Sequence, residues 1–110
     1  MARTHNPFAE RERSKVETPW GVFEIAPPNK ARLAEIEALQ VQAASLADGA
    51  LEESVVLGIR TAAAGVRDGE KLSEKLLAAW ESGEVTVDQV RSLAEFVGEE
   101  IAGEVDEGNG

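Results

Sequence analysis

The chain lacks cysteine and tyrosine, and its 110 residues include one histidine, His5. The absence of cysteine excludes disulfides, thiolate zinc sites and thiol nucleophiles. His5 has no second ligand or orienting carboxylate near it in the sequence, so we expect a solvated side chain rather than a metal ligand or a catalytic base. No glycine motif that cradles phosphate is present. We therefore expect no metal, no cofactor and no enzymatic activity.

Long apolar runs are also missing. No segment approaches the length needed to cross a bilayer, and residues 1–7 contain no apolar core of a signal peptide. We expect a protein of the cytoplasm that does not bind membranes.

Basic residues are scarce, since 11 lysines and arginines face 21 aspartates and glutamates, a net charge of −10. Residues 1–15 carry a net charge of +2, so the remainder carries −12. Such an acidic body repels phosphate, and we expect no nucleic-acid partner. A helix-turn-helix interpretation of residues 82–84 fails for the same reason, because Arg91 is the only base on the following helix. Paired carboxylates such as Glu52 and Glu53 are expected to be surface charge.

The sequence before the first predicted helix consists of two segments of different composition. Residues 1–15 are polar and charged, with Phe8 as their large apolar side chain, and we expect a flexible basic arm that orders late or on a partner. Residues 18–21 (TPWG) are typical of a type I turn, and the β-prone residues 22–25 (VFEI) follow. This pattern predicts a short β-hairpin or a single edge strand.

Apolar residues then recur at helical spacing in successive segments. The pattern predicts helices from the Asn29 cap to about Leu46, over 51–66, over about 70–82, and from Thr86 to Gly103. Gly58 and Gly65 lie near the apolar stripe of the second segment, which indicates close packing against a neighbour.

The start of the fourth helix is specified most fully. Thr86 and Gln89 form a capping box, and Val85 and Val90 occupy the positions of a hydrophobic staple. Short connections favour antiparallel packing of sequence neighbours. The predicted fold is mainly α, a small four-helix bundle with an N-terminal β-hairpin or edge strand. Its predicted divisions are the arm 1–15, the helical domain 16–103 and an acidic tail 104–110.

Two apolar groups could serve either as core or as partner-binding surface. The first group, in and after the predicted hairpin, would either cover the open end of the bundle or form an exposed apolar surface for a partner. The second group, on the fourth predicted helix, would either belong to the core or form one wall of a groove. The candidate residues are Trp20, Phe23 and Ile25 in the first group, and Val90, Leu93, Val97 and Ile101 in the second.

Residues 20–101 resemble tail assembly chaperones of long-tailed phages that infect actinobacteria. The resemblance rests on residues 23–28 (FEIAPP), 34–40 (AEIEALQ), 76–90 (LLAAWESGEVTVDQV) and 93–97 (LAEFV). These are helix caps and apolar stripes, without a catalytic signature.

The resemblance implies a non-enzymatic protein that binds the tape measure protein and keeps it soluble until tail tube subunits polymerise around it. The implied location is the host cytoplasm during assembly, and the protein would be absent from the mature virion. The alternative is a structural virion protein, a head–tail or capsid accessory piece, anchored by the basic arm. Whether the protein forms a homo-oligomer is left open by the sequence.

Overall fold

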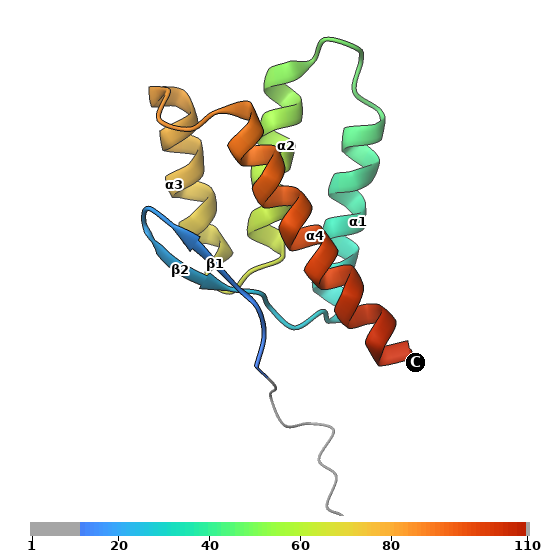
Figure 1. Cartoon of the computed structure of the whole chain (residues 1–110). Helices are drawn as coiled ribbons and strands as arrows, with labels where there is room; N and C mark the ends of the chain where they lie inside the picture. Colours follow the sequence, from blue (N-terminus) through green and yellow to red (C-terminus); the bar gives the residue numbers. More distant parts are fainter. Residues whose placement is uncertain (1–11, 110) are drawn as a thin grey trace, which may run out of the picture.

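The computed structural model describes residues 12–109, with side chains as far as Glu104. It is a small helical bundle preceded by a two-stranded hairpin, which confirms the predicted fold class (Figure 1). The elements in chain order are β1 (Lys15–Thr18), β2 (Gly21–Glu24), α1 (Lys30–Ala44), α2 (Leu51–Ala64), α3 (Gly69–Ser82) and α4 (Val87–Asn109).

The hairpin is antiparallel, and Thr18 pairs with Gly21 across the two-residue loop Pro19-Trp20. The Thr18 hydroxyl stabilises this turn by accepting a hydrogen bond from the Trp20 backbone N–H at 3.2 Å. Beyond β2, Ile25 forms an isolated antiparallel bridge with Val66, in the connection between α2 and α3. The bridge ties the hairpin to the end of α2.

Local capping signals fix several helix ends as predicted. The Asn29 side chain accepts a hydrogen bond from the Arg32 backbone N–H at 2.8 Å, which starts α1. Gly83 ends α3 in the left-handed conformation, with φ of +80°. The predicted capping box is confirmed: the Thr86 backbone N–H donates to Gln89 Oε1 at 2.9 Å, and the Gln89 backbone N–H donates to Thr86 Oγ1 at 3.2 Å.

The central helix of the bundle is α2, which packs against α1, α3 and α4. Figure 1 shows α4 running obliquely across α2, with α1 and α3 on either side. The close approach predicted for the two glycines is confirmed. A Cβ atom on Gly58 would lie 3.3 Å from Val90 Cγ1, and one on Gly65 would overlap Val97 Cγ1. Both neighbours belong to α4, so these glycines let α4 approach α2.

One apolar cluster forms the core and draws on every element from β2 to α4. Its most deeply buried large side chains are Ile25, Ile59, Leu72, Val66 and Val97. Among the described residues, no polar or charged residue is buried. The core is therefore held by apolar packing, with polar groups at its margins.

Several predicted boundaries differ from the structure, and one of them is that of the second helix, which ends at Ala64 rather than at residue 66. Of the predicted arm, residues 1–11 lie outside the described residues, whereas Lys15 already belongs to β1. The first helix ends at Ala44, two residues before the predicted Leu46, where the Ser45 hydroxyl donates to the Gln42 carbonyl oxygen at 2.9 Å. The predicted end of the fourth helix at Gly103 is wrong, since α4 continues to Asn109 through the segment expected to be a frayed acidic tail. Gly103 has no left-handed φ, so it does not terminate the helix.

None of the helices between residues 12 and 109 combines the length and the apolarity needed to cross a membrane.

Candidate functional site

Most of the predicted partner-binding side chains lie in the core. The buried ones, with relative exposures of 5% or less, are Phe23, Ile25, Val90, Val97 and Ile101. The first two close the bundle at the hairpin, and the other three line the face of α4 that meets α2. Their burial agrees with the core alternative, and Val90 also contributes to the floor of a surface groove.

The two remaining candidates are partly buried. Trp20, in the hairpin turn, and Leu93, on α4, both pack against the core cluster. Leu93 also lines a surface groove, so it is the candidate placed best for contact with another molecule.

Exposed apolar side chains occur at positions that the sequence analysis did not single out. They are Val22 (61% exposed), Val41 (64%), Leu51 (54%) and Phe96 (37%). Phe96 could have been noticed, because it lies three residues after Leu93 and beside the core stripe of the same helix rather than within it. The exposure of Val22, Val41 and Leu51 depends on how the elements pack, and no sequence signal marked it.

One groove on the described surface, the α1–α4 groove, lies between α1 and α4 and has α2 as its floor. Its volume is about 220 Å³. Val55, Gly58 and Val90 contribute apolar surface to it, and Ala43 and Ala94 line it from the two flanking helices. Small residues on both walls leave room above the floor, so the groove can accept apolar side chains of a partner.

The second, the β1–α4 groove, lies where β1 faces the N-terminal half of α4, with a volume of about 560 Å³. Val16 lines it from the strand, and Leu93 and Phe96 line it from the helix. Lys15 and Asp88 supply one charge of each sign.

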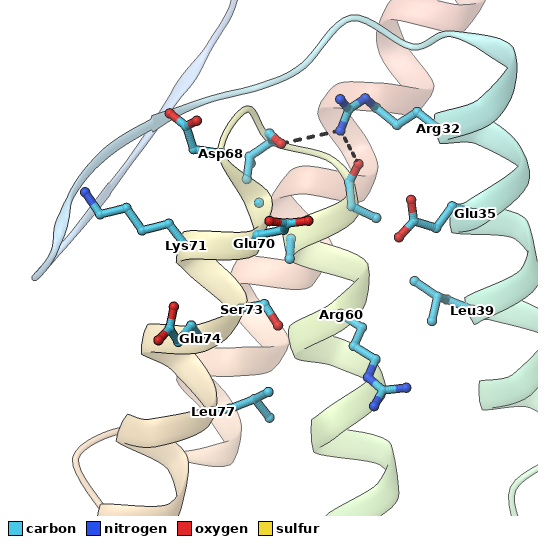
Figure 2. A pocket seen from close by; sticks show the side chains of 14 residues that line it. Arg32, Glu35, Leu39, Arg60, Asp68, Glu70, Lys71, Ser73, Glu74 and Leu77 are labelled. Carbon is cyan, nitrogen blue, oxygen red and sulfur yellow. Dashed lines mark hydrogen bonds between the residues drawn. The ribbon is translucent and has the colours of Figure 1, made fainter.

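The third groove is polar and lies on the side of α2 away from α4, between α1 and α3 (Figure 2). Its volume is about 1100 Å³. Three basic and four acidic residues line it: Arg32, Arg60, Lys71, Glu35, Asp68, Glu70 and Glu74. Because charges of both signs are mixed there, the lining favours neither an anion nor a cation.

Arg32 has a structural role at the edge of this polar groove. Figure 2 shows its side chain reaching from α1 to backbone carbonyl groups at the end of α2. Its Nη1 donates to the carbonyl oxygens of Ala64 at 2.6 Å and Val66 at 3.4 Å. A guanidinium that satisfies the last carbonyls of a helix also interacts favourably with the helix dipole.

Within the part of the chain that the structure describes, no three histidine, cysteine, aspartate or glutamate side chains are grouped so that they could hold a metal ion. His5 lies outside the described residues. The arrangement that the described residues do offer is apolar and concave, in the α1–α4 and β1–α4 grooves.

Comparisons of this chain with protein-family models, with curated proteins and with solved structures found no match.

Proposed function

We propose that this protein is a tail assembly chaperone of a long-tailed phage, which holds a helical segment of the tape measure protein in the α1–α4 groove. The observation that carries the proposal is this apolar groove, lined by Val55, Gly58 and Val90, on a small acidic helical domain. An amphipathic helix binds in such a groove by laying its apolar face on the floor. The resemblance of residues 20–101 to this family supports the same assignment.

The distribution of polar and apolar side chains in the groove agrees with a protein-binding site. The wall on α1 is formed by Gln40 and Ala43, one turn apart, and the wall on α4 by Val87, Arg91 and Ala94. Polar side chains therefore stand at the rim and apolar surface lies below them, which is the usual arrangement of a protein-binding site.

The charge of the protein supports the proposed role. A net charge of −10 makes copies of a loaded complex repel one another, which opposes aggregation of a long apolar partner. The same charge disfavours nucleic acid as a partner. In this proposal the protein acts in the host cytoplasm, hands the tape measure protein over as tail tube subunits assemble, and does not remain in the mature virion.

The proposal can be tested by co-expression with fragments of the tape measure protein encoded by the same phage. Ala43→Lys places a long charged side chain at an exposed position that lines the α1–α4 groove. Ala38→Lys is the matched control, an exposed position on the same helix that lines none of the three grooves. Circular dichroism should show that both variants keep the helical content of the parent.

We expect the parent and Ala38→Lys to keep a tape measure fragment soluble, and Ala43→Lys to lose most of this effect. Equal performance of the two variants would move the site away from the α1–α4 groove. Failure of the parent with every fragment would contradict the chaperone proposal itself.

The alternative, a structural virion protein anchored by its N-terminal arm, is favoured by one contact. Arg13 Nε lies 2.9 Å from Glu104 Oε1, so the C-terminal end of the predicted arm is held on α4. Mass spectrometry of purified virions separates the two functions, because a structural protein stays in the particle and a chaperone leaves it.

A further inference from the structure

The outer edge of β1 is unpaired among residues 12–109, since the sheet has two strands in the order β1-β2. The hydrogen-bonding pattern shows which backbone groups face outward. The Glu24 carbonyl oxygen accepts from the Arg67 N–H at 2.9 Å, on the side of β2 away from β1. Lys15 pairs with Glu24 and Glu17 pairs with Val22, so both lie at non-hydrogen-bonded positions and direct their own N–H and C=O groups to the outer edge.

This edge borders the β1–α4 groove. Lys15 and Val16 line the groove from β1, and the partly exposed Phe96 lines it from α4 together with Leu93. An unpaired strand edge beside apolar side chains is a template for an added strand, in which backbone hydrogen bonds supply affinity and one side chain fills the groove.

The N-terminal segment has the composition that fits this site. Residues 1–11 carry Arg3 and Arg11 against Glu10, a net charge of +1, and the rest of the chain therefore carries −11. Phe8 is the large apolar side chain of that segment, and it matches the apolar surface of Leu93 and Phe96. Because Pro7 lacks an N–H, a strand in which Asn6 and Phe8 pair with β1 would have an outer edge that resists further pairing.

The path of the chain before β1 indicates which copy supplies this strand. Arg13 is held by Glu104, and the Ser14 hydroxyl donates to Glu100 Oε2 at 3.0 Å, so the chain reaches β1 along the C-terminal half of α4. To enter the groove of its own copy, the segment would have to reverse direction at Glu12 and Arg13, next to this anchored side chain. A segment from another copy needs no reversal.

We propose that residues 1–11 of a second copy of this chain add as a strand to the outer edge of β1, with Phe8 against Leu93 and Phe96. Reciprocal exchange gives a symmetric dimer, in which each copy lends its N-terminal segment to the other. The exchange does not depend on the chaperone proposal, since it concerns contacts between copies of this chain alone.

The absence of cysteine allows a direct test by disulfide trapping in the full-length chain. Asn6→Cys, two residues before Phe8 on the same face of an extended strand, leaves Phe8 in place and is introduced into one preparation. Ser92→Cys, at an exposed position that lines the groove, is introduced into a second preparation with a different tag. The control partner is Val41→Cys, whose position on α1 is 64% exposed and outside this groove. Equal micromolar amounts are mixed and oxidised mildly, and the linked peptides are identified by mass spectrometry.

We expect at least about tenfold more linkage between positions 6 and 92 than between positions 6 and 41, because docking raises the effective concentration of the two thiols. Linkage between positions 6 and 92 no greater than the control would overturn the proposal. In an Asn6→Cys, Ser92→Cys double variant, linkage found only within one chain would also overturn the proposal, by showing that each copy fills its own groove.

A second readout needs no cysteine. The parent should be a dimer by light scattering, with slow hydrogen exchange at the Lys15 and Glu17 amides, and Phe8→Ala should be monomeric with faster exchange at both amides. Phe8→Leu keeps an apolar side chain and should retain the dimer and the slow exchange. An unchanged dimer and unchanged exchange in Phe8→Ala would contradict the proposal.

Discussion

Val97 of α4 occupies the space beside Gly65 at the end of α2, where a Cβ atom would overlap its Cγ1 atom. Gly65 has a φ of −96°, which any residue can adopt, so the glycine is required by packing rather than by backbone conformation. The two residues thus set how closely α4 crosses α2.

This contact predicts that substitution by alanine destabilises the protein at Gly65 but not at Gly58. Gly65→Ala should lower the free energy of unfolding by about 1–3 kcal/mol, because the added methyl overpacks the helix crossing. Gly58→Ala should be close to neutral, because its Cβ would lie 3.3 Å from Val90 Cγ1 and the tight contact offsets a helix-propensity gain of about 1 kcal/mol. Urea denaturation measures both.

A double variant checks the cause. If Val97 is what the new methyl meets, Gly65→Ala combined with Val97→Ala should be less destabilised than the sum of the two single variants. Additive losses would place the strain of Gly65→Ala elsewhere.

The capping box at the start of α4 gives a second prediction. Thr86→Ala removes the acceptor of the Gln89 N–H and should cost about 1 kcal/mol of stability. Ser92→Ala, at an exposed position of the same helix, should cost much less. Thermal unfolding of both variants tests this, and equal losses would mean that the cap contributes nothing specific.

The hydrogen bonds of Arg32 give a third prediction. Replacing it with methionine keeps the apolar stem but removes the donor to the Ala64 and Val66 carbonyl oxygens. We expect a loss of about 1–2 kcal/mol by urea denaturation, as for a partly buried hydrogen bond from a charged group. Arg60→Met, at an exposed position in the same polar groove, is the control and should change stability little.

The fourth concerns the ion pair between Arg13 and Glu104, whose side chains are 11% and 14% exposed. Glu104→Ala should loosen the segment before β1 and speed hydrogen exchange at the Ile25 amide, which donates to the Ser14 carbonyl oxygen at 2.9 Å. Glu99→Ala, at an exposed position of α4, should leave that exchange rate unchanged. The same rate in both variants would show that the ion pair does not hold the strand.

The sequence alone determined the local features of this protein. Asn29, Thr86 and Gln89 mark helix starts because a capping side chain bonds backbone groups only a few residues away. The recurrence of apolar residues at spacings of three and four predicted the four helices. A turn sequence followed by β-prone residues predicted the hairpin. Each of these features depends on residues that are close together in the sequence.

Only the tertiary structure decided which apolar residues are buried and which remain exposed. Val90, Val97 and Ile101 are buried because α2 lies against them, whereas Phe96, one position from Val97, is 37% exposed beside β1. The end of α4 was equally undetermined, because Gly103 can either stop a helix or continue it. Burial depends on the crossing of α4 over α2, which Gly58 and Gly65 permit but whose direction no local pattern specifies.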